Sequence, residues 1–269
     1  MKLKVIEDNN TYIDVYYLGE PGVSYYIEDE GTKILFDTAY SDAFLKNGKD
    51  MGIDLKAVDK LVLSHGHDDH TGGLKFYFDR KMESLELVAH PGSLEYKEDD
   101  DGTPICSPLT KEELSKLCKL SLSKEPVKLS KNITFLGQIP RTLDFEPKYS
   151  IGRAKRDGKL VADFMDDDSA LVYQGKEGIF IITGCSHSGI CNIIEYAKKV
   201  TGDDRIYGVI GGFHLFDVDE RLEATIKYLK KEKIKFLYPC HCVSLDCKVE
   251  IGKELKIHEV GVGLEIEYE

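Results

Sequence analysis

The sequence lacks the features of a membrane-spanning or exported protein. No stretch approaches about 18 uninterrupted apolar residues, which is the length that a membrane-spanning helix needs. The N-terminus, MKLKVIEDNN, carries acidic residues within its first eight positions and has no apolar core of the signal-peptide type. We therefore expect a soluble, cytoplasmic protein that has no membrane partner.

Positive charge is also in short supply, and the cysteines do not form an even set. There are 36 Lys and Arg residues against 48 Asp and Glu residues, which gives a formal net charge of −12. Because phosphate backbones require a cationic face, this balance argues against a nucleic-acid partner. Seven cysteines without an export signal fit reduced thiols better than a disulfide framework.

The pattern of apolar residues predicts alternating strands and helices. The chain has 269 residues and 42% hydrophobic content, which is enough for one large domain over residues 1–269. Strands or hairpins are expected at 23–38, 60–64, 85–90, 170–184, 207–211 and 234–238, and helices at 189–200 and 218–232. The prediction is an α/β fold whose strands end at polar or histidine-bearing loops.

Residues 91–160 have a weaker pattern. This region contains five prolines after Pro91, an acidic run at 98–101 and one helical stretch at about 110–120. Such interrupted periodicity is typical of an insertion, and we expect a cap or lid over the site.

The segment SHGHDDHTGG concentrates metal-binding side chains. His65, His67, Asp69 and His70 lie within six residues, although the chain has only eight histidines. Imidazole and carboxylate together suit Zn²⁺, Mn²⁺ or Fe. A solvated polar loop would not require this concentration of histidines, and a structural zinc site usually includes cysteines in a closed set of four ligands.

The motif H-x-H-x-D-H after a short strand, with ILFDT upstream, resembles the signature of the metallo-β-lactamase superfamily. The resemblance implies a four-layered αβ/βα sandwich, here with an inserted cap segment. It also implies one or two divalent metal ions, zinc before manganese or iron, and it gives Asp37 a supporting role behind the metal site. Asp69 would bind metal and would also orient or deprotonate the attacking water.

Two later histidines resemble the remaining ligands of that superfamily. His187 follows the strand that ends in TGCSH, and His241 follows the strand that ends in YPCHC. The superfamily commonly has a bridging aspartate near the first of these positions, where this chain has Cys185. Either Cys185 takes the place of the bridging residue, or the bridge is absent and the second metal is in doubt.

The other histidines and cysteines carry weaker signals. His214 in GGFHLF is either a donor to the substrate or a packed histidine, and the sequence leaves both readings open. Cys240 and Cys242 are expected to be buried and to point away from the side of His241, because side chains alternate along an extended segment. We expect structural roles for His90, His258, Cys191 and Cys247.

The combination of HGHDDHTGG, GCSHSGICN, GGFHL and PCHC resembles most closely one subgroup, named 7,8-dihydropterin-6-methyl-4-(β-D-ribofuranosyl)aminobenzene-5′-phosphate synthase-like metallo-hydrolases. We therefore expect a metal-dependent hydrolase acting on a small anionic or phosphorylated metabolite. A synthase-type condensation and a non-catalytic metal sensor are the alternatives. Four basic residues either bind the anionic group or form a solvated surface cluster: Arg141, Arg153, Lys155 and Arg156. The substrate, the metal and the oligomeric state stay open.

Overall fold

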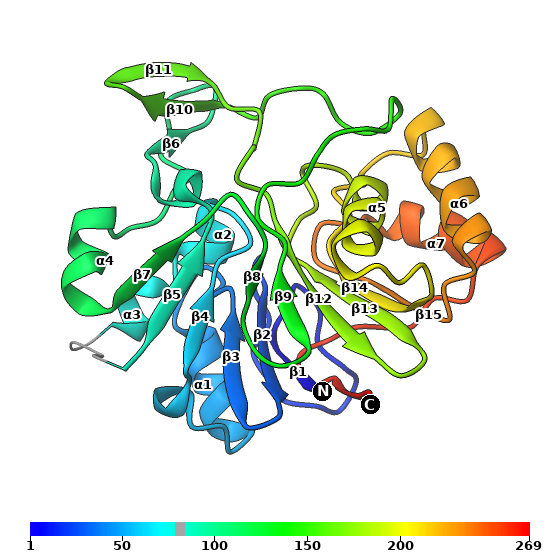
Figure 1. Ribbon diagram of the computed structural model, residues 1–269, viewed down its shortest axis with the longest axis horizontal. Coiled ribbons are helices and arrows are strands. Elements are labelled where there is room, and N and C mark those ends of the chain that lie inside the picture. Colours follow the sequence, from blue (N-terminus) through cyan, green and yellow to red (C-terminus); the bar gives the residue numbers. More distant parts are fainter. Residues whose placement is uncertain (79–83) are drawn as a thin grey trace.

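Two β-sheets face each other in the computed structural model, which describes residues 1–78 and 84–269 (Figure 1). The seven-stranded sheet has the order β16-β1-β2-β3-β4-β5-β7, and the six-stranded sheet has the order β15-β14-β13-β12-β9-β8. The strands of the first sheet are β1 (Lys2–Glu7), β2 (Ser24–Asp29), β3 (Thr32–Phe36), β4 (Lys60–Val62), β5 (Glu86–Ala89), β7 (Lys119–Leu122) and β16 (Glu265–Glu267). Those of the second are β8 (Val127–Lys128), β9 (Ile133–Phe135), β12 (Ala170–Gly175), β13 (Gly178–Thr183), β14 (Ile206–Gly211) and β15 (Phe236–Pro239).

Helices cover the outer faces of both sheets. The seven α-helices are α1 (Ala43–Asp50), α2 (Asp68–Thr71), α3 (Leu74–Tyr77), α4 (Lys111–Leu117), α5 (Ile190–Thr201), α6 (Glu220–Glu232) and α7 (Leu245–Glu254), counted over the described part of the chain. Two short 3₁₀ helices are η1 (Leu55–Ala57) and η2 (Pro91–Leu94). Figure 1 shows α1, α3 and α4 on the side of the first sheet and α5, α6 and α7 on the side of the second.

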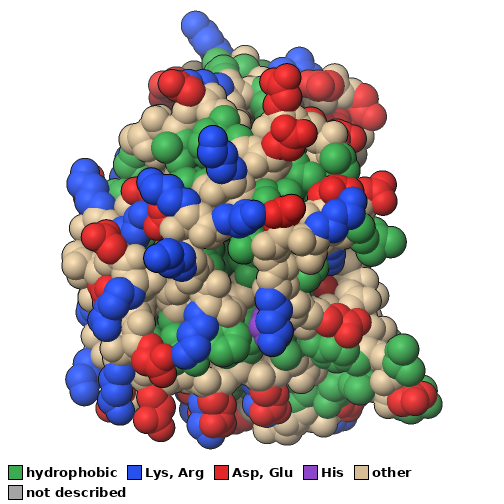
Figure 2. Space-filling model, turned by 90° about the vertical axis from the view of Figure 1, so that its right-hand side faces the viewer, with side chains coloured by type: hydrophobic (Ala, Val, Ile, Leu, Met, Phe, Trp, Pro, Cys, Tyr) green, Lys and Arg blue, Asp and Glu red, His purple; other side chains and the backbone are tan. Residues whose placement is uncertain are grey.

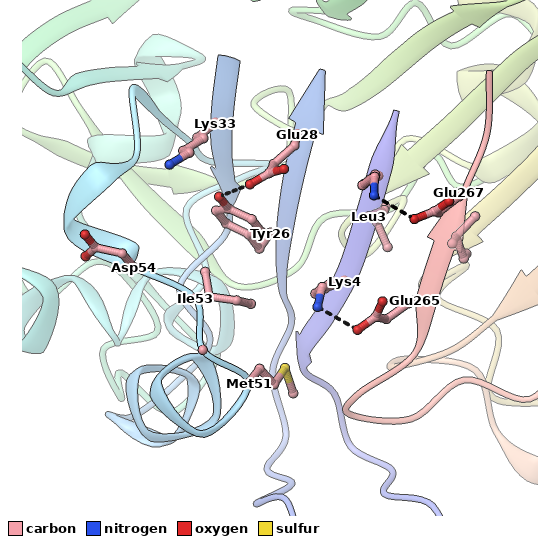
Figure 3. A pocket seen from close by; sticks show the side chains of 13 residues that line it. Leu3, Lys4, Tyr26, Glu28, Lys33, Met51, Ile53, Asp54, Glu265 and Glu267 are labelled. Carbon is pink, nitrogen blue, oxygen red and sulfur yellow. Dashed lines mark hydrogen bonds and ion pairs between the residues drawn. The ribbon is translucent and has the colours of Figure 1, made fainter. Parts of the chain in front are cut away.

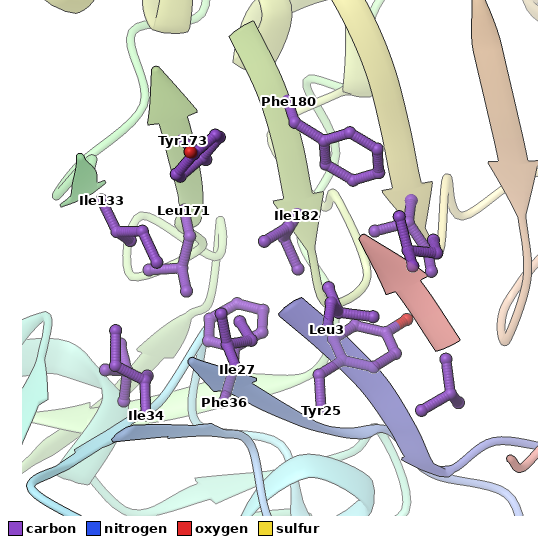
Figure 4. Packing of buried hydrophobic residues seen from close by; sticks show 14 of the residues in the cluster. Leu3, Tyr25, Ile27, Ile34, Phe36, Ile133, Leu171, Tyr173, Phe180 and Ile182 are labelled. Carbon is purple, nitrogen blue, oxygen red and sulfur yellow. The ribbon is translucent and has the colours of Figure 1, made fainter. Parts of the chain in front are cut away.

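Among the residues that the structure describes, three apolar cores lie between the four layers. The central core lies between the sheets and joins residues such as Phe36 of β3 to Phe180 of β13 (Figure 4). On β2, Tyr25 and Ile27 belong to this central core, whereas Tyr26 belongs to the core under the helices of the first sheet. This alternation follows from the two-residue period of a strand. The predicted four-layered αβ/βα sandwich of the metallo-β-lactamase fold is confirmed.

The hairpins predicted from the sequence are present. β2 pairs antiparallel with β3, and β12 pairs antiparallel with β13. β4 and β5 pair in parallel in the first sheet, and β13, β14 and β15 pair in parallel in the second. The carboxyl ends of several strands therefore meet at one end of the sandwich.

The region 91–160 is not one continuous insertion. β7 pairs with β5 in the first sheet, and β9 pairs with β12 in the second, so residues 119–135 belong to the sandwich itself. Their signal in the sequence is weak because these strands have only two to four residues each. Outside the sandwich lies a small third sheet of β6 (Lys97–Glu98), β10 (Arg153–Arg156) and β11 (Lys159–Ala162). We call it the small sheet.

The surface is mixed in charge. Figure 2 shows Lys and Arg side chains interspersed with Asp and Glu on the face that carries the second sheet's helices, without a continuous basic area there. Among the described helices, none is long and apolar enough to cross a membrane.

Candidate metal centre

The predicted ligands lie at the carboxyl ends of strands from both sheets. Asp37 follows β3, and the HGHDDH segment follows β4 and runs into α2. From the second sheet, Cys185 and His187 follow β13, and His241 follows β15. Residues far apart in the sequence meet because the strands of each sheet end together at this edge.

The first group of ligands consists of His65, His67 and His187. Nε2 of His187 lies 3.2 Å from Nε2 of His65, and the rings of His67 and His187 are 4.9 Å apart. All three side chains are buried, with His67 the most exposed at 8%. The three imidazole rings thus lie side by side, and His65 and His67 also form a candidate ligand set with Asp69.

The second group consists of Asp69, His70 and His241. Nε2 of His70 lies 3.2 Å from Nε2 of His241. Oδ2 of Asp69 lies 3.5 Å from the first of these atoms and 3.3 Å from the second. This group therefore offers two nitrogens and one oxygen to a neighbouring ion.

Cys185 lies between the two groups. Its Sγ is 3.1 Å from Nε2 of His70 and 3.2 Å from Nε2 of His241. It also forms a possible ligand set with His65 and His187, in which all ligand atoms lie within 4.8 Å of one another. The thiol therefore lies within reach of both groups, where a ligand shared by two metal ions would have to stand.

The donor set fits divalent metal ions. Nε2 of His67 is buried and has no hydrogen-bond partner among the described residues. An unpaired buried nitrogen is costly unless another partner uses its lone pair, as a metal ion does. Nitrogen, thiolate and carboxylate ligands together suit zinc and neighbouring transition metals.

The protonation states favour binding in the first group. Burial lowers the pKa of His67 to about 4 and holds the pKa values of His65 and His187 well below the usual value. These imidazoles are therefore neutral and have lone pairs available. At His70, burial also opposes protonation, but Asp69 and Asp37 outweigh it and raise the pKa to about 9. A metal ion must displace that proton.

Further side chains orient the ligands from behind. Oδ2 of Asp37 accepts from Nδ1 of His70 at 2.7 Å, as the family resemblance implied, and Oδ1 accepts from the amide of Ser64 at 2.7 Å. Nδ1 of His241 donates to Oδ1 of Asn9 at 2.8 Å. A Cβ atom at Gly184 would lie 2.2 Å from Oγ of Ser64, so only glycine lets the two sheets approach this closely.

Three residues that support the predicted ligands were not predicted from the sequence. Asn9 lies far from every histidine in the chain, and no motif marks it. Asp167 and Asp168 belong to an acidic run that no motif marks, and both are buried. They reach the site because they lie between the loops that follow β4 and β13, where they accept from the amides of Gly66 and Ser188.

His214 lies beside the first group. Its ring centroid is 4.5 Å from that of His187, and its backbone has a φ of 50°, in the left-handed region. Burial, together with the nearby Arg221, lowers the pKa of His214 to about 4. Arg221 donates to the carbonyl of His214 at 2.8 Å and so holds this strained turn.

The cysteines of PCHC differ from each other. Cys240 is buried in the core, where its Sγ lies 3.2 Å from Oη of Tyr25. Cys242 does not point away from the site: its Sγ accepts from the amide of His214 at 3.3 Å and contacts the carbonyl of Cys185 at 3.5 Å. The tight turn at His241, with a φ of 51°, breaks the strand alternation on which the prediction depended.

The remaining histidines and cysteines have structural surroundings. Nδ1 of His90 accepts from the amide of Gly92 at the start of η2, and His258 stacks on Tyr238 with a centroid distance of 4.8 Å. Cys191 and Cys247 are buried in the core of the second sheet's helices.

Of the four basic residues expected either to bind an anion or to form a solvated surface cluster, the three arginines have partners within the protein. Arg141 donates to the carbonyl of Pro147 at 3.0 Å, and Arg153 pairs with Glu98 at 2.7 Å. Arg156 pairs with Glu95 and Asp163, whereas Lys155 is exposed on the small sheet. The structure does not bring these four side chains together with the histidines.

A separate groove of about 400 Å³ lies at the edge of the first sheet beside α1 (Figure 3). Its cations Lys2 and Lys4 pair with Glu267 and Glu265 at 2.9 and 2.6 Å. It is lined by neither histidine nor cysteine, and none of its lining residues belongs to a candidate ligand set.

Comparisons with known proteins agree with this geometry. The profile of the metallo-beta-lactamase superfamily matches residues 18–241. The 7,8-dihydropterin-6-methyl-4-(beta-D-ribofuranosyl)-aminobenzene-5′-phosphate synthase of Methanocaldococcus jannaschii is 35% identical over 256 residues, which cover 89% of this chain and 86% of that protein. A second protein of that organism is 32% identical over 252 residues, covering 93% of this chain and 94% of its own length.

Solved structures show the same fold. Tm1679, described as a metal-dependent hydrolase of the beta-lactamase superfamily, aligns with a TM-score of 0.85 and 28% identity over 99% of this chain and 98% of its own. Zn²⁺-bound PqqB from Methylobacterium extorquens aligns with a TM-score of 0.58 and 12% identity over 99% of this chain and all of its own. The profile match and the identity to the M. jannaschii synthase establish the family: this chain belongs to the metallo-β-lactamase superfamily.

Proposed function

We propose that the protein is a metal-dependent hydrolase of a small anionic or phosphorylated metabolite. The observation that carries the proposal is the pair of ligand groups that share Cys185. One set joins His65 and His187 to this thiol, and the other joins Asp69, His70 and His241 to it. The centre would hold two divalent ions, with zinc favoured, and His67 lies beside the first set.

Bound metal ions would supply a nucleophile at neutral pH, by lowering the pKa of water, and would polarise the group under attack. Asp69 is suited to orient the attacking water. Its side chain is 30% exposed, whereas that of His70 is fully buried, so it borders the open part of the site. Although burial opposes it, His70 and His241 hold the pKa of Asp69 below its ordinary value, and the carboxylate stays available as an acceptor.

His214 is suited to contact the substrate. It lies next to the first group and is half-buried. The candidate ligand sets among the described residues do not include it. A neutral imidazole there would donate a hydrogen bond to a developing oxyanion or to a leaving group. The exposed ring of Phe216, with its centroid 4.7 Å from that of His214, would form an apolar wall beside this donor.

A second candidate is a synthase-type condensation on a ribofuranosylaminobenzene phosphate. It is favoured by the name of the M. jannaschii protein that is 35% identical to this chain. The same ligands would then stabilise anionic intermediates without net hydrolysis. A metal sensor without turnover is the third alternative, and it would keep the ligand groups but need no donor at His214.

Metal content and turnover test these functions together. We expect one to two transition-metal ions per chain after reconstitution, lost on chelation, and hydrolysis of at least one ester or phosphodiester in a substrate panel. Less than about 0.2 equivalents of Zn²⁺, Mn²⁺ or Fe²⁺ would contradict every metal-based function. Pterin turnover without hydrolysis would favour the synthase, and bound metal without turnover on either panel would favour the sensor.

A further inference from the structure

A buried segment, Asp167–Ser169, lies between the two loops that carry the first ligand group. Oδ2 of Asp167 accepts from the amide of Gly66 at 2.9 Å, and the amide of Ser169 donates to the carbonyl of Ser64 at 2.9 Å. On the other side, Oδ2 of Asp168 accepts from the amide of Ser188 at 2.9 Å. The segment thus contacts both chain neighbours of His65 and one chain neighbour of His187, Ser188.

The contact between Asp167 and the amide of Gly66 lies within the loop that carries two of the predicted ligands. Gly66 stands between His65 and His67, and its amide belongs to the peptide unit that joins it to His65, so the contact holds that peptide plane and with it the start of the turn between the two histidines. A Cβ atom at Gly66 would lie 2.6 Å from the carbonyl oxygen of Ser93 and 3.0 Å from Cε of Lys97. The loop is therefore enclosed on that side, and Asp167 supplies a charged acceptor to its amide.

Asp167 is itself held by a buried lysine from the small sheet. Nζ of Lys97 lies 2.7 Å from Oδ1 of Asp167 and 2.6 Å from Oδ2 of Asp163. The side chain of Lys97 is only 1% exposed. A lysine and two carboxylates removed from water are expensive, and such groups often stabilise a fold no better than apolar residues would. Their contribution here is better explained by position than by stability.

The backbone of the small sheet is also connected to the loop that carries His65 and His67. The carbonyl of Lys97 accepts from the amide of Ile105 at 3.0 Å, and the next residue, Cys106, forms a β-bridge with His67. Lys97 therefore lies on a strand that is connected to the ligand loop by two independent routes. A displacement of β6 would therefore disturb both the contact of Asp167 with Gly66 and the β-bridge at His67.

We propose that Asp167, held in place by Lys97, is a positioning residue of the metal centre. It fixes the Gly66 amide and with it the directions in which His65 and His67 point. This inference rests on the proposed metal site. Residues behind metal ligands commonly change metal affinity by about 10- to 100-fold when they are replaced.

Asp163 provides a matched control for Asp167. Both carboxylates are buried and pair with Lys97, but only Asp167 contacts Gly66. Asp163 additionally accepts from Arg156 and from the amide of Met165, so its removal should cost at least as much stability. If Asp167 served only the stability of the fold, replacing either carboxylate would therefore change Zn²⁺ binding to a similar extent.

The experiment measures the Zn²⁺ affinity of Asp167→Ala and Asp163→Ala by competition with a chromophoric chelator, alongside the melting temperature of the metal-free proteins. We expect similar losses in melting temperature, and a weakening of Zn²⁺ binding by about 10- to 100-fold for Asp167→Ala only. Equal affinities in the two variants, with normal metal binding by the wild type, would overturn the positioning role alone. A wild type that binds no metal would overturn the proposed function as well.

If an alanine variant does not fold, the pair Asp167→Asn and Asp163→Asn keeps the side-chain volume and removes one negative charge in each case. A neutral oxygen is a weaker acceptor for the Gly66 amide than a carboxylate. The expected order of Zn²⁺ affinities is therefore the same, with a smaller difference, and equal affinities would again overturn the proposal.

Discussion

Nδ1 of His70 lies 2.7 Å from Oδ2 of Asp37, and both side chains are fully buried. Because the carboxylate accepts the Nδ1 proton, Nε2 is the atom that faces His241 and Cys185, and its lone pair would become available there once a metal ion displaced the second proton. Asp37 therefore fixes both the tautomer and the orientation of a ligand without contacting the metal position itself.

Replacing Asp37 with Ala should weaken binding at the second ligand group by about 10- to 100-fold, since the imidazole of His70 would lose its fixed orientation. Titration with Zn²⁺ against a competing chelator measures the change. Asp29→Ala is a suitable control, because Asp29 is also buried but accepts from Ser130 and Asn132 instead. Equal losses in both variants would mean that only general stability was affected.

The late histidines should separate into ligands and a substrate-binding residue. His187→Ala and His241→Ala should each lose metal, because they remove an atom of a ligand group. His214→Ala should keep the metal and lose turnover by about 10²- to 10⁴-fold, the usual contribution of a positioned acid or base. Elemental analysis distinguishes them. Metal lost from His214→Ala but retained by His187→Ala would reverse the two assignments.

Cys185 should contribute a thiolate to the metal centre. We expect the Co²⁺-substituted protein to show thiolate-to-metal charge-transfer absorption that disappears in Cys185→Ser. Burial raises the pKa of the free thiol, so metal binding should release its proton as well.

Cys242→Ser is the matched control for that experiment. Cys242 also lies beside the site, but its Sγ accepts from the amide of His214. It belongs to none of the candidate ligand sets among the residues that the structure describes. If the charge-transfer absorption persisted in Cys185→Ser and vanished in Cys242→Ser, Cys242 would be the thiolate ligand instead.

Stability should fall as the pH rises through neutrality, because of Glu7. Burial raises the pKa of this side chain to about 8. Between its ordinary value of 4.5 and 8, the folded state binds more protons than the unfolded state, so the free energy of unfolding decreases with increasing pH. The contribution is fully present below pH 4.5 and is lost as the pH passes 8.

Glu7→Gln should remove this slope, which amounts to at most about 1.4 kcal/mol per pH unit. Denaturant unfolding of the metal-free wild type and variant between pH 5 and about 9 covers the relevant window. Parallel curves for the two proteins would show that Glu7 is ionised in the fold.

Hydrogen exchange should divide the region 91–160 into two classes. β9 is buried and paired in the second sheet, so its amides should be well protected. β11 is exposed along its whole length and lies at the edge of the small sheet, where β10 is its one neighbour among the described strands, so its amides should exchange faster. Uniform protection of β9 and β11 would mean that the small sheet is as stable as the sandwich.

The sequence by itself determined the family, the main hairpins and the first ligands. His65, His67, Asp69 and His70 are local to one strand end, and their spacing is sufficient to predict a metal site. His187 and His241 were predicted because each follows an apolar run that reads as a strand. Local patterns succeed wherever the residues that act together are also close in the chain.

Only the tertiary structure decided the surroundings of that site. Cys185 comes to lie between the ligand groups because β13 and β4 end at the same edge in different sheets. Asn9, Asp167 and Lys97 act through contacts that span 66 residues or more, and such contacts leave no periodic signal in the sequence. Likewise, the short strands β7 and β9 are too brief to be recognised alone, and they are strands because the edges of the two sheets supply their hydrogen bonds.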